Sequence, residues 1–240
     1  MLSFFMRANN FSKACVQMRE AVYGIKAFSQ IGPNQFNIST GTAFMIAPGV
    51  LITCAHLCHI ENNPSRPRHS AFQVIRALDI GQRLEKCTFM TEDVEQDLAL
   101  LHIDNPRSIR CVKLTYKQIK RGTPVGSFGF PLAFIDQNTG VFRLVERFQG
   151  AYISSFNYKI TSSGRKIYYY ETDSLMYKGS SGCPGFLSNG KVFGMHNASV
   201  VEQSPQVSRQ GTSQEIRLAI SLWVPAKDII DFATHNKIKL

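Results

Sequence analysis

Short stretches of apolar residues, either continuous or alternating with polar ones, recur along the first half of the chain and predict strands. They cover residues 21–28, 41–46, 50–54, 71–78, 83–90 and 98–103. These stretches are rich in residues that suit a pleated surface, and turn signals such as Pro48-Gly49 separate them, as is typical of strands joined by tight connections. The pattern therefore predicts an all-β unit over residues 21–104.

A second series of strands follows a polar, basic connection at residues 105–121. Its apolar or alternating stretches cover residues 123–130, 142–155, 166–172, 185–187, 191–196 and 216–224. Pro124 is compatible with this pattern, because proline is tolerated where a strand begins or lies at a sheet edge. Residues 122–224 are therefore predicted to form a second all-β unit.

Helices are predicted at both ends of the chain. Residues 1–20 are amphipathic and free of acidic residues up to Glu20, which favours a short docked helix and leaves a targeting or membrane-surface segment as the alternative. In residues 225–240, Ile229, Ile230 and Ala233 form one apolar face and Pro225 suits the first helical turn. The whole chain is then one domain with two β halves and a closing helix.

The composition indicates a soluble globular protein with an excess of positive charge. The chain is 44% hydrophobic and 18% charged, with a formal net charge of +10, so disorder is not expected. An acidic protein surface or a nucleic acid is a conceivable partner, although a solvated basic surface is favoured because no basic run interleaves with aromatics. The basic clusters are Arg66, Arg68 and His69; Lys113, Lys117, Lys120 and Arg121; and Lys159, Arg165 and Lys166.

The six cysteines are too few and too spread for a disulfide scaffold. Reduced thiols in the cytoplasm are the simpler interpretation. Cys54, His56, Cys58 and His59 crowd together, but no second ligand pair follows at a zinc-finger spacing. We therefore expect no metal and no cofactor, and no apolar run is long enough to cross a membrane.

Three motifs carry candidate chemistry, in the order histidine, acid, serine. "TCAH" ends with His56 after a strand, "DLAL" begins with Asp97 before a strand, and "GSSGCP" places Ser181 in a glycine-rich turn. A serine hydroxyl is a poor nucleophile without a base that takes its proton, and histidine serves that role near neutral pH. The motifs predict nucleophilic catalysis if the fold brings them together.

In these motifs the chain resembles the trypsin-like serine endopeptidases of the chymotrypsin fold, in the disulfide-poor branch that includes HtrA-like proteases and glutamyl endopeptidases. The resemblance runs from about Ala21 to the closing helix. It implies two packed antiparallel β-barrels, with His56 as the base, Asp97 as the acid that orients it and Ser181 as the nucleophile. The amides of Gly179 and Ser181 would form the oxyanion hole.

The candidate nucleophile and the candidate acid have rivals in the sequence. Ser180 precedes Ser181, but only Ser181 has glycine two places before and one place after it. Cys183 is a second candidate nucleophile that does not fit the frame. Glu92 and Asp93 are alternative acids near Asp97.

The resemblance also locates a specificity pocket. Leu175 stands at its base, where a buried acid would select Lys or Arg, so cleavage after basic residues is disfavoured. His196, in a G-x-H pattern, matches relatives whose histidine meets a Glu or Gln side chain, but Met176 replaces their usual threonine. A small or medium apolar cleavage-site residue competes with this interpretation. Asn197, Ala198 and Ser199 should pair with the substrate backbone.

Two hypotheses for function follow from the sequence. The first is a serine endopeptidase that hydrolyses polypeptides through an acyl-enzyme. The second is a catalytically silent protease fold whose basic surface binds an acidic partner. Three complete motifs favour the enzyme, because a silent domain has no chemical need for them.

Overall fold

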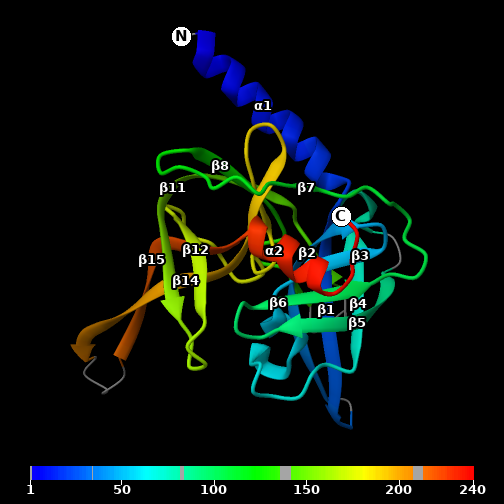
Figure 1. The fold of residues 1–240 in the computed structure, drawn as a ribbon. Coiled ribbons are helices and arrows are strands. Elements are labelled where there is room, and N and C mark those ends of the chain that lie inside the picture. The colour runs from blue at the N-terminus through cyan, green and yellow to red at the C-terminus, as the bar shows by residue number, and fades with distance from the viewer. Residues whose placement is uncertain (1, 34, 82–83, 136–141, 208–212) are drawn as a thin grey trace.

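The protein folds into two packed β units with a helix at each end (Figure 1). The structure is a computed structural model that describes residues 2–33, 35–81, 84–135, 142–207 and 213–240. Arg83, where the fifth strand is predicted to begin, lies outside the described residues. The all-β expectation is confirmed.

The first unit is a closed barrel of six antiparallel strands, hydrogen-bonded in the order β1-β2-β3-β6-β5-β4. The strands are β1 (Val22–Gly32), β2 (Gln35–Ala47), β3 (Val50–Thr53), β4 (Ala71–Arg76), β5 (Glu85–Asp93) and β6 (Leu98–His102). Three 3-10 helices lie in its connections: η1 (Ala55–Cys58), η2 (Ile60–Asn62) and η3 (Ala77–Asp79).

The second unit is a seven-stranded sheet in the order β13-β8-β11-β12-β15-β14-β7, and an additional β13–β14 pairing closes six of these strands into a ring. The strands are β7 (Lys113–Leu114), β8 (Pro124–Gly129), β11 (Arg147–Ile160), β12 (Lys166–Thr172), β13 (Pro184–Phe186), β14 (Lys191–Val207) and β15 (Ser213–Pro225). Only β7 departs from the antiparallel expectation, because it pairs with β14 in parallel. Strands β9 (Phe134–Ile135) and β10 (Phe142–Arg143) form a separate small sheet.

Several boundaries differ from the sequence prediction. The predicted strand 142–155 is divided into β10 and β11, and β14 continues to Val207. The extension of β14 is a long hairpin with β15, in which Glu202 pairs with Ile216. Backbone pairing does not require apolar side chains, so the polar sequence of this hairpin concealed it.

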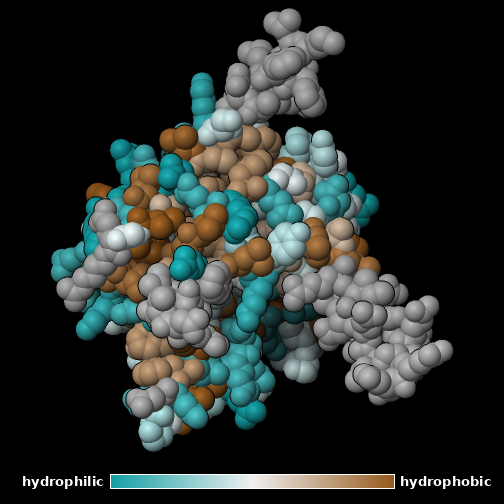
Figure 2. Space-filling view, turned by 180° about the vertical axis from the view of Figure 1, so that it is seen from behind, coloured by the Kyte–Doolittle hydropathy of each residue, from teal (hydrophilic) through white to brown (hydrophobic). Residues whose placement is uncertain are grey.

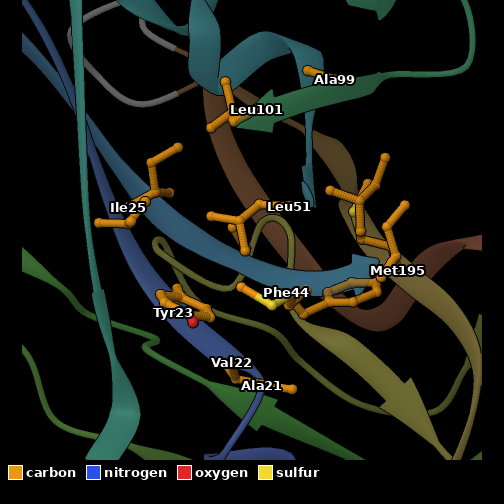
Figure 3. Packing of buried hydrophobic residues seen from close by; sticks show 14 of the residues in the cluster. Ala21, Val22, Tyr23, Ile25, Phe44, Leu51, Ala99, Leu101 and Met195 are labelled. Carbon is orange, nitrogen blue, oxygen red and sulfur yellow. The ribbon is translucent and has the colours of Figure 1, made fainter. Parts of the chain in front are cut away.

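The main core joins the two units. Phe44, Leu51 and Leu101 of the first barrel are fully buried, and Met195 of β14 is fully buried in the same cluster. Figure 3 labels these four side chains among those of the cluster. A second cluster, with Trp223 among its members, fills the second unit. On the face seen in Figure 2, hydrophobic residues lie interspersed among hydrophilic ones.

The helices dock against the second unit. Helix α1 (Leu2–Arg19) buries Ala14 and Met18, and the ring of Phe11 lies 5.8 Å from that of Phe148. Helix α2 (Ala226–His235) buries the predicted apolar face. Pro225 is its N-cap rather than part of its first turn. Among the described residues, no helix is both long and apolar enough to cross a membrane.

Candidate active site

His56 and Asp97 meet at one end of the first barrel. His56 lies in η1 just after β3, and Asp97 comes directly before β6. Strands β3 and β6 are antiparallel partners, with Thr53 opposite Ala99, so the chain leaving β3 passes the chain entering β6. Nδ1 of His56 lies 2.8 Å from Oδ2 of Asp97. The His56 amide also donates to Oδ1 at 2.9 Å, which fixes the carboxylate from both oxygens.

A tight turn holds Asp97 in place. Its φ is +58°, in the left-handed region, where Asp is found more often than most other L-residues. The Asp97 amide donates to the Val94 carbonyl at 3.3 Å. Oδ1 of Asp93 accepts from the Gln96 amide at 3.0 Å. These two bonds close the turn and set the direction of the Asp97 side chain.

The loop that carries Ser181 depends on two glycines with positive φ. Gly179 has φ +92° and Gly182 has φ +85°. A Cβ at Gly179 would lie 2.6 Å from the Phe130 carbonyl oxygen, and one at Gly182 would overlap the Thr42 carbonyl oxygen. Only glycine therefore fits at these positions. The Ser181 carbonyl accepts from the Thr42 amide at 2.9 Å, which ties the loop to the first barrel.

His56 and Ser181 face one cavity of about 220 Å³ between the two units. Several residues of the predicted specificity pocket also line this cavity. The lining residues are Thr40, His56, Leu57, Asn62, Met176, Tyr177, Lys178, Gly179, Ser181, His196, Asn197, Ala198 and Ser199. His56 and Ser181 are thus brought to one concave site, and each comes from a different unit.

The amides proposed for the oxyanion hole border the same cavity. In the described part of the chain, the Ser180 amide donates to the Tyr177 carbonyl and the Gly182 amide to the His196 carbonyl. No such backbone bond is found there for the amides of Gly179 and Ser181. Two N–H groups therefore remain to bind an oxygen atom at this point.

The rival nucleophiles are poorly placed. Ser180 is fully buried and does not line the cavity. The Cys183 thiol is also buried and donates to Oγ1 of Thr42 at 3.3 Å. Burial raises the pKa of Cys183 to about 12, which leaves almost no thiolate near neutral pH.

The rival acids have other partners. Glu92 pairs with Nε2 of His59 at 2.9 Å and with Arg68 at 2.7 Å. Asp93 pairs with Arg165 at 2.6 Å. Asp97 is the acid that contacts His56.

His196 lies in the cavity wall, and its imidazole ring is buried. It is 3% exposed, and in the described part of the chain neither ring nitrogen has a hydrogen-bond partner. Burial lowers the pKa of His196 to about 3, and the nearby Ser180 carbonyl offsets only part of this effect. The edge of the ring meets Trp223 with centroids 5.2 Å apart. The imidazole is therefore neutral and has hydrogen-bonding capacity to spare.

The other predicted pocket residues divide into two groups. Met176, Asn197, Ala198 and Ser199 line the cavity. Leu175 is not among the lining residues, and its carbonyl accepts from Nε2 of Gln149 at 2.8 Å. Its assignment to the base of the pocket stays a prediction.

The cluster considered for zinc in the sequence is not the one that the fold assembles. Cys54, His56 and Asp97 bring ligand atoms within 4.8 Å of one another. Cys58 instead contacts the Cys54 carbonyl, and His59 contacts Glu92. A metal at Cys54, His56 and Asp97 would have to break the His56–Asp97 hydrogen bond. Burial also raises the pKa of Cys54 well above its ordinary value, which opposes the thiolate form that metals bind.

Ion pairs neutralise part of the basic clusters. Arg66 pairs with Glu61 and Arg68 with Glu92, while Arg165 pairs with Asp93. Paired cations offer less charge to an outside partner. No contact among the described residues supports the less favoured alternative of an acidic partner.

Sequence reasoning missed a residue that links the two units. Thr42 is fully buried, and its Oγ1 donates to the Gly179 carbonyl at 3.2 Å and accepts from the Phe130 amide at 3.1 Å. The Thr53 hydroxyl donates to the Thr42 carbonyl at 2.7 Å. A threonine in an apolar strand gives no signal of this role, because its partners are far away in the sequence.

Comparisons with known proteins agree with the fold. A family model described as a trypsin-like peptidase domain matches residues 41–195. The fold is similar to the active form of the Rv3671c protease from M. tuberculosis, with a TM-score of 0.70 and 16% identity over 97% of this chain and 88% of that chain. No curated protein matches the sequence. Since the family model covers more than half of the chain, the protein belongs to the trypsin-like peptidase family and is a serine endopeptidase.

Proposed function

We propose that His56, Asp97 and Ser181 hydrolyse peptide bonds through an acyl-enzyme. Oγ of Ser181 attacks the substrate carbonyl carbon while Nε2 of His56 takes the hydroxyl proton. The tetrahedral intermediate then collapses, the C–N bond breaks, and His56 returns the proton to the leaving amine. Water repeats the sequence on the ester and releases the acid with Ser181 regenerated.

The observation that carries this proposal is the two-point contact between His56 and Asp97. The 2.8 Å contact at Nδ1 and the 2.9 Å amide contact hold the ring and the carboxylate in one relative orientation. With Nδ1 bound to the carboxylate, Nε2 is left to accept the serine proton. The carboxylate also stabilises the imidazolium that forms during each proton transfer.

The amides of Gly179 and Ser181 stabilise the oxyanion in this mechanism. The negative charge develops on the substrate oxygen as Ser181 attacks. One preorganised donor of this kind contributes about 2.7–4 kcal/mol to transition-state stabilisation. The positive φ of Gly179 supports this role, because a side chain there would collide with Phe130 and turn the amide away.

A burst experiment with an activated ester tests the acyl-enzyme. We expect rapid release of about one equivalent of leaving group per chain, followed by slower turnover. Intact mass spectrometry should find the acyl group on the chain. Ser181→Ala should abolish the burst and lower kcat by about 10⁶-fold. Ser180→Ala is the matched control and should retain both the burst and the original kcat. A burst that disappears in Ser180→Ala and persists in Ser181→Ala would refute the proposal.

We further propose that His196 selects a polar, uncharged side chain at the cleaved bond, with glutamine ahead of glutamate. Its buried ring nitrogens lack partners among the described residues, and His196 lines the same cavity as Ser181. An unmade buried hydrogen bond is costly, and a substrate amide supplies the missing partner. A carboxylate would bring a buried charge that a neutral imidazole does not balance.

The substrate backbone has an edge on which to pair. Beyond Met195, β14 pairs with β15 on one side, with Ala198 opposite Leu222, whereas its pairing with β13 ends at Met195. The other edge at Asn197, Ala198 and Ser199 is the place for an added strand. This arrangement would lead the substrate side chain toward His196.

A peptide-library digest read by mass spectrometry tests the specificity proposal. We expect cleavage mainly after glutamine. His196→Ala should reduce cleavage after glutamine without equal loss of esterase activity on a small ester. Cleavage mainly after small apolar residues or glutamate would contradict the proposed role, and both results leave the acyl-enzyme test unaffected.

A further inference from the structure

One ion pair connects the second unit to the turn that carries Asp97. Arg165 precedes β12 in the turn of the β11–β12 hairpin. Its Nη1 lies 2.6 Å from Oδ2 of Asp93, at the end of β5 in the first barrel. Glu95 of the same turn is more distant, at 4.0 Å from Nη1. A cation from one unit therefore binds the acidic turn of the other.

Asp93 passes this contact to the catalytic turn. While Oδ2 meets Arg165, Oδ1 accepts from the Gln96 amide at 3.0 Å. Gln96 is the neighbour of Asp97, which takes a φ of +58° at the end of this turn. Both carboxylate oxygens of Asp93 are thus used, one to close the turn and one to attach it to the other unit.

The Arg165 side has its own local order. The Thr161 amide donates to the Arg165 carbonyl at 2.9 Å, and the Arg165 amide donates to Oγ1 of Thr161 at 3.1 Å. These bonds fix the backbone of the hairpin turn from which the guanidinium extends. The cation is therefore presented from an ordered turn rather than from a free loop.

We propose that Arg165 is a positioning residue for catalysis. It holds the Asp93–Asp97 turn from across the interface and so keeps the Asp97 carboxylate aligned with His56. The proposal rests on the proposed function, because it requires Asp97 to orient the base. Arg165 itself is outside the active-site cavity and lines a different cavity with Asp93, Gln96 and Asp228.

The size and kind of the effect follow from the exposure of the pair. The Arg165 side chain is 45% exposed and that of Asp93 is 17% exposed, so the ion pair is partly screened by water. Loss of a partly exposed ion pair that stabilises the transition state corresponds to a fall of about three- to fivefold in rate. Since neither residue lines the active-site cavity, the loss should fall on kcat and leave KM unchanged.

Steady-state kinetics on a peptide amide substrate tests the proposal. Arg165→Ala should lower kcat about three- to fivefold with KM unchanged. Arg165→Lys restores the charge and should recover part of this loss. Lys159→Ala removes an exposed cation from β11 of the same hairpin and is the matched control, which should keep the original kcat. Equal kcat for Arg165→Ala and the control would overturn the proposal.

A double-mutant cycle asks whether Arg165 acts through Asp93. Asp93→Asn keeps an oxygen for the Gln96 amide but removes the charge that Arg165 binds. If Arg165 and Asp93 act as one unit, the kcat of the double variant should be no lower than that of the slower single variant. Losses that multiply would overturn the proposed route.

Salt dependence supplies a readout that a purely structural role would not move. Raising the salt concentration screens exposed charges, so the kcat ratio between the original chain and Arg165→Ala should fall toward one. A ratio that does not change with salt would count against the ion pair. If the original chain neither turns over substrate nor is acylated at Ser181, the proposed function fails and this inference falls with it. If Ser181 is acylated and Arg165→Ala keeps full kcat, this inference alone fails.

Discussion

The two β units contribute different parts of the active site. The first barrel carries His56 and Asp97, the proposed base and acid, on short connections beside neighbouring strands, β3 and β6. The second unit carries Ser181, the proposed nucleophile, in a glycine-dependent loop and most of the pocket wall, including His196 on β14. In the proposed mechanism, proton transfer is organised by the first barrel and substrate recognition mainly by the second unit. Such a site depends on how accurately the two units are joined.

The joint has a small number of identifiable contacts. Thr42 of β2 binds the Ser181 loop through its amide and its hydroxyl. The buried core also continues from the first barrel to Met195 of β14. Burial supplies most of the stabilisation, because apolar contact is worth more than isolated polar pairs. The polar contacts set the position of the Ser181 loop relative to the first barrel.

Breaking the contact between Asp97 and His56 in the first barrel should cause the greatest loss of activity. Asp97→Asn keeps the shape of the side chain but replaces the carboxylate that holds Nδ1 of His56. The histidine then loses the tautomer that catalysis needs, and kcat should fall by about 10⁴-fold. Steady-state kinetics measures this change. A loss of less than tenfold would show that Asp97 is not the orienting acid.

A second, smaller effect comes from loosening the joint at Thr42. Thr42→Val preserves volume but leaves the buried Phe130 amide without the acceptor that it has at 3.1 Å. The free energy of unfolding should fall by about 1–3 kcal/mol. Urea denaturation measures it, with Thr88→Val on β5 as a control, because the Thr88 hydroxyl is exposed. Equal free energies of unfolding for the two variants would show that Thr42 does not stabilise the contact between the two units.

The smallest expected effect lies at Asp228 in α2, behind the Asp97 turn. Burial, with a smaller contribution from Asp231, raises the pKa of Asp228 from 3.8 to about 6. The folded chain thus holds this proton more tightly than the unfolded chain, so stability is lost as pH rises from about 4 to about 6. Asp228→Asn should raise the free energy of unfolding at pH 7.5 by about 1–2 kcal/mol, after allowance for partial exposure.

The gain at Asp228 should disappear at low pH. At pH 4 and below, the side chain is protonated in the folded state and the substitution changes little. Denaturation at both pH values separates this effect from a general stabilisation. Asp231→Asn, on the exposed part of the same helix, is the control. A gain of the same size at pH 4 would contradict the assigned cause.

The local motifs were readable in the sequence because they depend on nearby residues. His56 follows a strand, Asp97 precedes one, and the Gly179–Gly182 frame needs residues without side chains. The links between motifs were not readable. Thr42 and Arg165 act on partners that lie far along the chain, and no local pattern distinguishes them from an ordinary strand threonine or a solvated arginine. The β14–β15 extension was hidden because backbone pairing can extend along polar sequence.

Labelling with a serine-reactive fluorophosphonate, mapped by peptide mass spectrometry, tests the cross-unit site most directly. We expect one label per chain, attached to Ser181, with no labelling in Ser181→Ala and much slower labelling in Asp97→Asn. This combination requires a nucleophile in one unit to depend on an acid in the other. Labelling at a different residue, or labelling of Ser181 at an unchanged rate in Asp97→Asn, would contradict it.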